Sequence, residues 1–271
     1  MKPKNDHLNN IEIQLQNGLL VTREWLLAQG LSIHSIDNQL KSGHLVALSR
    51  GVYHRPHVSL NWQNVASSLS FLYHDQWLVG GLTALELLGF AHFMNLSGQH
   101  KVHLYGEKPL PKWVRTHLTE AEKGDSELTK TTFHWQGSCR LWHNSNDELL
   151  TKHTTKITWR GSLPPMLVST AERALLEMLL IVPKQVSLEN ADYIVQAMTN
   201  LSARKLKEVL TLCKSVKVKR LFFWLADRQQ YSWRKKLQVE DFDLGAGKRV
   251  IVKGGKLDQQ YSITVPEHLH G

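Results

Sequence analysis

The first part of the chain shows apolar residues at helical spacing, interrupted by glycines. Apolar residues at positions 11, 15 and 19 predict a helix over Ile11–Leu20 that ends at Gly18. Thr22 stands directly before the next helix-like segment, and Gly30 follows it. Threonine is a favourable N-cap and glycine a favourable residue just beyond a helix, so a second, short helix is expected between them.

The following segment repeats this pattern and adds an amphipathic stripe. Ser32 precedes it as an N-cap and Gly43 closes it, which predicts a helix over residues 33–42. Ile33, Ile36 and Leu40 recur at three- and four-residue spacing, so we expect them to form one buried stripe. A tight turn therefore joins this helix to the one before it.

After this helix the pattern changes to short β-like runs. These are Leu45–Leu48 and Val52–His54, and Gly51 between them can supply the positive φ of a tight hairpin. Helix, short helix, tight turn, helix and two-stranded hairpin is the order of a winged helix-turn-helix. We therefore predict an α+β protein with a winged helix-turn-helix domain over residues 1–60 and a larger mixed α/β C-terminal domain over residues 61–271.

This layout predicts a surface that reads DNA. The second helix of such a pair lies in the major groove, where asparagine pairs with adenine and lysine reaches guanine or phosphate. Arginines of the wing contact phosphate or the minor groove. The predicted DNA-binding residues are His34, Ser35, Asn38, Lys41, Arg50 and Arg55. Winged helices also serve as protein-interaction modules, and the layout alone leaves that alternative open.

The charge balance favours a polyanionic partner. Lys and Arg number 33 against 24 Asp and Glu, which gives a net charge of +9. Residues 1–60 carry only six basic and four acidic side chains, whereas residues 204–236 hold eleven basic and two acidic ones. One winged helix of such modest charge binds weakly, so specific binding requires a dimer, self-association on DNA or a second DNA-binding surface.

The basic segment near the C-terminus is a candidate for that second surface. Trp224, Tyr231 and Trp233 are interleaved with its cations and could stack on nucleic-acid bases. A merely solvated basic face is the alternative, and the sequence does not choose between DNA, RNA and another acidic partner. The predicted basic surface consists of Arg204, Lys205, Lys207, Lys214, Lys217, Lys219, Arg220, Arg234, Lys235 and Lys236.

Helices and strands alternate beyond residue 60. Helices are predicted over Trp62–His74, Leu82–Leu88, Leu188–Met198, Ala203–Cys213 and Val218–Gln229. Strands are predicted over Lys101–Tyr105, Thr132–Gly137, Lys156–Arg160, Val250–Val252 and Tyr261–Val265. Ser169 and Glu172 have the spacing of a capping box, which predicts a helix that runs to about Leu180.

Residues that suggest catalysis each have a simpler structural interpretation. The predicted capping box accounts for Glu172, next to Arg173. Asp241 and Asp243 resemble the paired carboxylates of a nucleotidyltransferase, but the upstream Gly-Ser loop is absent, so they are interpreted as surface or turn acids. His100 and His103 lack a third ligand at metal-site spacing. We predict a protein that is not an enzyme, with no catalytic residue, metal or cofactor, and a nuclease is the remote alternative.

Location follows from what the sequence lacks. The two cysteines, Cys139 and Cys213, cannot build a disulfide framework, and the first ten residues are polar, unlike a signal peptide. The densest apolar stretch is far shorter than the roughly 20 residues that a membrane-spanning helix needs. We expect a cytoplasmic protein without a membrane partner.

Several segments resemble one family in order along the chain. Thr22–Gly30, followed by Gly43–Tyr53 with its Arg-Gly-Val-Tyr ending, resembles the opening domain of AbiEi-type antitoxins. Leu163–Glu177, Asp243–Arg249 and Gly255–Pro266 resemble later segments of the same family, as do residues 216–226. AbiEi antitoxins belong to type IV toxin–antitoxin systems associated with bacterial abortive infection.

The resemblance implies a transcriptional repressor that autoregulates its operon by binding inverted repeats in promoter DNA. It also implies a C-terminal domain that neutralises a nucleotidyltransferase-like toxin and can support multimerisation, without requiring a stable complex with the toxin. RNA stays an alternative partner, because a tRNA-directed toxin can be opposed at its substrate. The rival hypothesis is a protein- or RNA-interaction module with a winged helix and a basic C-terminal surface that does not regulate transcription.

Overall fold

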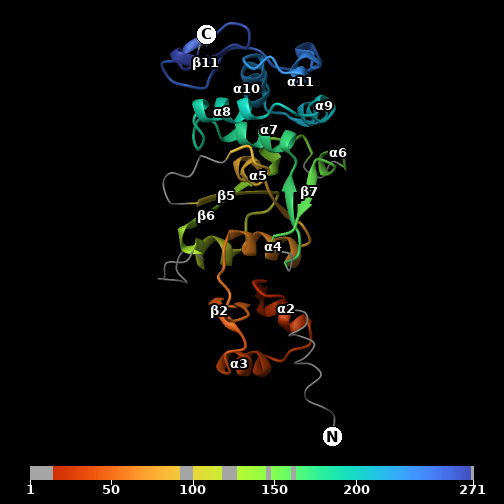
Figure 1. Cartoon of the computed structure of the whole chain (residues 1–271), viewed down its shortest axis with the longest axis vertical. Coiled ribbons are helices and arrows are strands. Elements are labelled where there is room, and N and C mark those ends of the chain that lie inside the picture. The colour runs from red at the N-terminus through yellow and green to blue at the C-terminus, as the bar shows by residue number, and fades with distance from the viewer. Residues whose placement is uncertain (1–14, 92–99, 118–126, 145–147, 160–162, 270–271) are drawn as a thin grey trace. The chain divides into compact units, whose positions relative to one another are not determined.

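The computed structural model describes residues 15–91, 100–117, 127–144, 148–159 and 163–269 (Figure 1). The chain forms two compact units, each built from segments that are distant in sequence. The first comprises Met1–Leu78, Ser97–Trp135 and Lys156–Leu167, and the second comprises Val79–Leu96, Gln136–Thr155 and Val168–Gly271. Helices and sheets occur throughout the described residues, which confirms the predicted α+β class. The domain boundary at residue 60 stays a prediction.

The N-terminal module lies in the first unit, where two helices and a two-stranded hairpin follow one another as predicted, preceded by a short strand that was not predicted. These elements are β1 (Val21–Thr22), α2 (Arg23–Ala28), α3 (Ile33–Lys41), β2 (Val46–Ser49) and β3 (Val52–His54). The strands form an antiparallel sheet in the order β1-β3-β2. Thr22 and Ser32 are the N-caps, because their hydroxyl oxygens accept the backbone N–H groups of Trp25 at 3.2 Å and Ser35 at 3.1 Å. Gly51, with φ +81°, lies in the turn before β3.

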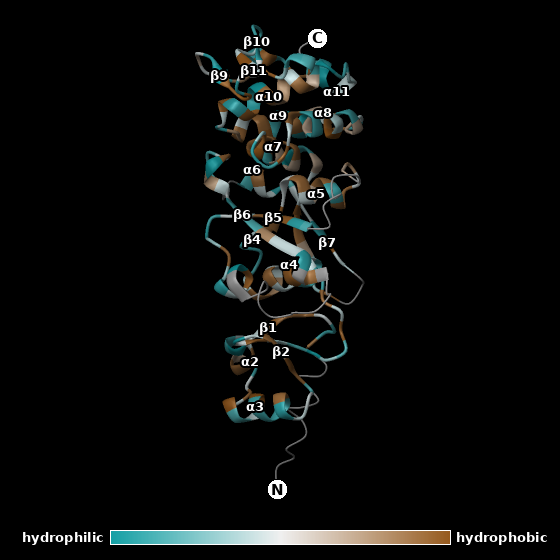
Figure 2. Ribbon diagram, turned by 90° about the vertical axis from the view of Figure 1, so that its left-hand side faces the viewer, coloured by the Kyte–Doolittle hydropathy of each residue, from teal (hydrophilic) through white to brown (hydrophobic). Residues whose placement is uncertain are grey.

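Two predictions for this module are wrong in part. Ile33 is 55% exposed, although the stripe of α3 predicted its burial. It is the first residue of α3, and the apolar cluster of the module includes Ile36 and Leu40 but not Ile33. Residues 15–20 contain no helix, and positions 11–14 of the expected first helix lie outside the described residues. Figure 2 shows hydrophilic and hydrophobic residues mixed along α3.

A five-stranded sheet has the order β6-β5-β4-β8-β7. Its strands are β4 (Trp77–Val79), β5 (His100–Gly106), β6 (Thr131–Gly137), β7 (Thr154–Ile157) and β8 (Met166–Ser169). Helix α4 (Trp62–Leu72) precedes β4, and short π or 3-10 helices lie at Trp113–His117, Glu127–Lys130 and Ser138–Arg140. The strand predicted at Lys156–Arg160 is displaced toward the N-terminus, and residue 160 lies outside the described residues.

Most of the described helices lie in the second unit. They are α5 (Gly81–Leu87), α6 (Glu148–Thr151), α7 (Ala171–Ile181), α8 (Leu188–Ala197), α9 (Ala203–Leu212), α10 (Val216–Asp227) and α11 (Ser232–Lys235). Residues 172–179 of α7 are all buried, and α7 contacts α5, α9 and α10. A small sheet, β10-β11-β9, follows, with β9 at Arg249–Val250, β10 at Lys256–Asp258 and β11 at Ile263–Val265. Single 3-10 turns lie at Val239–Asp241 and Glu267–Leu269.

The capping box predicted at Ser169 and Glu172 is wrong. Ser169 is the last residue of β8, and Thr170 is the N-cap of α7. Glu172 accepts the backbone N–H of Ser202, the N-cap residue of α9, at 3.0 Å. Local spacing suggested the motif, but the strand ends one residue too late to form it. Glu172 is therefore a structural residue, although in a different role from the predicted one.

Glu177 is the centre of a buried polar network in the second unit. Its Oε2 atom accepts the hydroxyl of Ser169 at 2.7 Å and the backbone N–H of Gly81 at 3.0 Å. Its Oε1 atom accepts Nε of Arg173 at 2.8 Å, and Arg173 also donates to the carbonyl oxygen of Leu150 at 3.2 Å. A buried carboxylate is stable only when paired and hydrogen-bonded, so this network ties α7 to β8, α5 and α6.

Candidate nucleic-acid interface

Helix α3 presents a polar face to solvent. Ile36 is fully buried, whereas His34, Asn38 and Lys41 are exposed. These three residues recur at spacings of four and three, so they share one side of the helix. Ser35 is half-buried, and its backbone N–H is used by the Ser32 cap. The face offers one amide, one imidazole and one ammonium group, which are hydrogen-bonding groups suited to base edges and phosphates.

The wing, formed by β2 and β3, contributes two further cations to the N-terminal module. Arg50 is exposed at the turn between β2 and β3, and Arg55 is half-buried just after β3. Both positions agree with the placement expected from the sequence, but their contact with DNA stays a prediction. The guanidinium group of Arg50, at the hairpin tip, is suited to phosphate oxygens, since arginine can donate two parallel hydrogen bonds.

The structure adds Arg23 and Lys112, which the sequence reasoning did not select. Both line a hollow of about 600 Å³ in the first unit, together with Arg50. Arg23 is held in place by Tyr53, whose hydroxyl oxygen accepts Nε at 3.1 Å and Nη2 at 2.9 Å. Arg23 directly follows the predicted N-cap Thr22, so its helix position was a usable signal. Lys112 gave none, because it is far from the module in the sequence.

The predicted basic surface is only partly exposed. Its exposed cations are Arg204, Lys207, Lys214, Lys235 and Lys236, and its half-buried ones are Lys205, Lys217 and Arg234. Arg204 pairs with Glu208 and Lys207 with Asp241, each at 2.6 Å. Lys219 and Arg220 are buried, so their placement on a surface was wrong. A helix with an apolar stripe does not show which of its cations later segments will cover.

Arg220 instead holds the C-terminal segment to α10. Its guanidinium donates to the carbonyl oxygens of Leu244 at 2.7 Å, Gly245 at 2.9 Å, Gly247 at 2.6 Å and Ser262 at 3.2 Å. The side chain is 3% exposed. These four acceptors satisfy a buried charge without a carboxylate, so Arg220 is a structural residue of the second unit.

The aromatic residues of the basic segment do not form a stacking platform. Trp224 and Trp233 are buried, and Nε1 of Trp233 donates to the carbonyl oxygen of Met198 at 3.0 Å. Tyr231 is half-buried, and its hydroxyl donates to the carbonyl oxygen of Gln196 at 2.6 Å. The prediction that these rings stack on bases is therefore wrong for the two tryptophans.

The contacts of the acidic and histidine candidates fit structural roles. Asp241 pairs with Lys207, and Asp243 accepts the backbone N–H of Gly245 at 2.7 Å, as expected of a surface acid and a turn acid. Burial, followed by the neighbouring charges of His134, Lys101 and His100, lowers the pKa of His103 to about 4. Within the described residues, no group of His, Cys, Asp and Glu could hold a metal ion. In the same part of the chain, no helix is long and apolar enough to cross a membrane.

The fold thus defines an α+β protein with an N-terminal winged helix-turn-helix and a larger mixed C-terminal part. The family model for AbiEi antitoxins, described as transcriptional regulators of type IV toxin–antitoxin systems, matches residues 99–266. The model for the AbiEi antitoxin N-terminal domain matches residues 4–96. The chain belongs to the AbiEi antitoxin family, which confirms the resemblance found in the sequence.

A solved structure supports the same fold. The crystal structure of the Rv2827c protein from Mycobacterium tuberculosis is similar with a TM-score of 0.58 and 13% sequence identity. The similarity covers 90% of this chain and 85% of that one. Among curated proteins, no match was found. At this identity the crystal structure informs the fold alone.

Proposed function

We propose that this antitoxin represses its own operon by binding promoter DNA through α3 and the wing. The observation that carries the proposal is the exposed face of α3, where His34, Asn38 and Lys41 stand opposite the buried Ile36. A helix of this kind, in the second position of a helix-turn-helix, enters the major groove with its side chains against base edges. The family membership of the chain supports the same function.

The residues divide into two kinds of DNA contact. Asn38 is suited to adenine, with which an amide forms two hydrogen bonds, and such a pair discriminates by about 1–3 kcal/mol. Arg23 and Arg50 are suited to phosphates, which fix orientation without reading sequence. The modest charge of residues 1–60 favours binding of two chains to inverted repeats, because one module alone supplies few phosphate contacts.

We further propose that the C-terminal domain counteracts a nucleotidyltransferase-like toxin. Its exposed cations Lys214, Lys235 and Lys236 are available for an acidic surface or an RNA, whereas Arg220 is committed to the fold. Direct toxin contact and competition for an RNA predict different results. Direct contact gives co-purification with the toxin, and competition gives protection that depends on these cations without a stable complex.

Gel-shift titration with the DNA upstream of the gene tests the repressor function. The full chain is compared with the variants Asn38→Ala and Arg50→Ala, and with Asn200→Ala, an exposed asparagine of the second unit, as the matched control. We expect Asn38→Ala to relax base preference and Arg50→Ala to weaken binding to all sequences by a similar factor. The absence of any shift at low salt would contradict the proposal.

Toxin neutralisation is tested separately with the double variant Asn38→Ala/Arg50→Ala, co-expressed with the neighbouring toxin gene. Point variants are preferable to a truncation, since the first compact unit contains residues on both sides of residue 60. If the two functions are separable, the variant loses repression and still protects cells. If it loses both, antitoxicity depends on the DNA-binding surface.

A further inference from the structure

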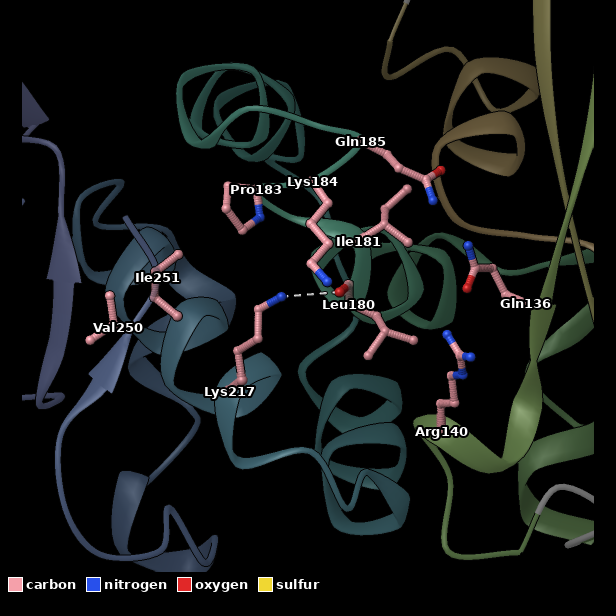
Figure 3. A pocket seen from close by; sticks show the side chains of 10 residues that line it. All are labelled: Gln136, Arg140, Leu180, Ile181, Pro183, Lys184, Gln185, Lys217, Val250 and Ile251. Carbon is pink, nitrogen blue, oxygen red and sulfur yellow. Dashed lines mark hydrogen bonds between the residues drawn. The ribbon is translucent and has the colours of Figure 1, made fainter. Parts of the chain in front are cut away.

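A cavity of about 520 Å³ lies in the second unit, where β6, α7, α10 and β9 contribute its lining (Figure 3). This volume is within the roughly 300–1,000 Å³ of small-molecule sites in proteins. Its residues come from positions 136–251, and each belongs to the same compact unit. The DNA-binding proposal makes no use of this cavity.

The charge of the cavity is one-sided. Among its described lining residues, Arg140, Lys184 and Lys217 are cations and none is acidic. Figure 3 shows the charged end of Lys217 joined by a hydrogen bond to the Leu180 carbonyl oxygen, and Lys184 among the lining residues. A hollow lined by cations favours an anion, because the ligand charge relieves the repulsion between Lys184 and Lys217.

Lys217 is built into the wall of the cavity. Its Nζ atom donates to the carbonyl oxygen of Leu180 at 3.0 Å and to that of Val182. Burial, followed by the positive charge of Lys184, lowers the pKa of Lys217 to about 8. A bound phosphate would favour the charged form of this lysine. The ion pair between the two would therefore contribute to the binding energy of an anion.

The rest of the lining is apolar or carries amides. Val250 is 63% exposed, and it lies with Pro183 and Ile251 toward one side of the cavity in Figure 3. The amides of Gln136 and Gln185 lie toward the other side. An inorganic anion would use the cations alone, whereas a ligand with an apolar planar part would also cover the exposed valine.

We propose that this cavity binds a free nucleotide, with its phosphates among Arg140, Lys184 and Lys217 and its base against Val250 and Pro183. The juxtaposition of cations and apolar surface favours a nucleotide over inorganic phosphate. The cavity is lined by four chain segments, at residues 136–140, 180–185, 217 and 250–251, and its limited volume favours a single nucleotide over a continuous nucleic-acid strand. The proposal is independent of DNA binding by α3.

Calorimetric titration of the full chain with each of the four ribonucleoside triphosphates tests the assignment. Pyrophosphate and a short RNA with a 5′-phosphate are titrated in parallel. We expect at least one nucleotide to bind at least tenfold more tightly than pyrophosphate, and more tightly than the RNA. Weaker binding of all nucleotides than of either competitor would overturn the proposal, as would no binding of any nucleotide at millimolar concentration.

Variants then locate the site. Arg140 and Lys184 are exposed, so the double variant Arg140→Gln/Lys184→Gln is expected to fold normally and to bind the nucleotide at least tenfold less tightly. The matched control, Lys152→Gln/Lys256→Gln, removes the same charge from exposed positions outside the cavity lining and should bind as the wild type does. Val250→Ser should weaken the binding of the nucleotide but not that of pyrophosphate. Equal affinity of both double variants would overturn the assignment.

Discussion

Replacement of Arg220 by methionine tests the assignment of this residue to the fold. The substitution keeps much of the side-chain length but removes the guanidinium, which donates to the carbonyl oxygens of four residues. Hydrogen bonds of charged groups contribute roughly 1.5–3 kcal/mol each, and contributions of one side chain are not additive. Because the freed carbonyl groups can turn toward water, we expect a loss of about 3–5 kcal/mol, below the simple sum.

Urea unfolding followed by tryptophan fluorescence measures this loss. With a slope of roughly 2–3 kcal/mol per molar urea, the midpoint should fall by about 1–2.5 M. Amide hydrogen exchange should rise first in residues 243–265, the segment that Arg220 holds. Arg220→Lys keeps the charge but not the fork of donors, so its midpoint should be intermediate.

Arg204→Met is the matched control for this experiment. Arg204 is exposed and pairs only across the surface with Glu208, so its loss should cost less than about 1 kcal/mol. If Arg220→Met and Arg204→Met shift the midpoint equally, then Arg220 does not hold the C-terminal segment and our reasoning about it is wrong.

Three further predictions concern other buried or exposed groups. Glu177→Gln should destabilise the protein by about 3 kcal/mol, since it leaves Arg173 as a buried charge without a counter-charge. Thermal unfolding measures this loss, and a change below about 1 kcal/mol would contradict the prediction. The pKa of His103 is about 4 in the folded protein, against an ordinary value of 6.5. Between these values the unfolded chain binds the proton more readily than the folded one. The stability of the folded protein should therefore fall as the pH drops from 7 to 4. His103→Leu should flatten that decline, and an unchanged pH profile would refute the assignment. Ile33, exposed on α3, is suited to the methyl group of thymine, so Ile33→Ala should weaken binding to thymine-containing operator DNA but not to its uracil-substituted form.

Local signals in the sequence located most of the elements. Thr22 and Ser32 cap their helices as predicted, because an N-cap interaction joins residues only three positions apart. The capping box at Ser169 and Glu172 is wrong although its spacing was correct, because β8 extends through Ser169 and Thr170 is the N-cap instead. Local patterns therefore predict where helices occur more reliably than what their terminal side chains contact.

The surroundings of Arg220 and the proposed nucleotide site depend on contacts between residues distant in the sequence, which local patterns do not predict. Arg220 and Lys219 share the basic segment with exposed cations, and Arg220 is held by carbonyl groups of residues 244–262, which lie further along the chain. The proposed nucleotide site likewise combines Arg140 with Lys184 and Lys217 from other elements. The α3 face was predictable because one helix carries it, although the exposure of Ile33 at its first turn was not.

Selection of randomised DNA by the full chain tests the central claim most directly. Sequencing of the bound fraction gives the base preference at every operator position, for the wild type and for Asn38→Ala. We predict an inverted-repeat motif matching the DNA upstream of the gene, with the preference for adenine lost at one position per half-site in the variant. Identical motifs for the two proteins, or no enriched motif for the wild type, would contradict the conclusion that α3 reads DNA.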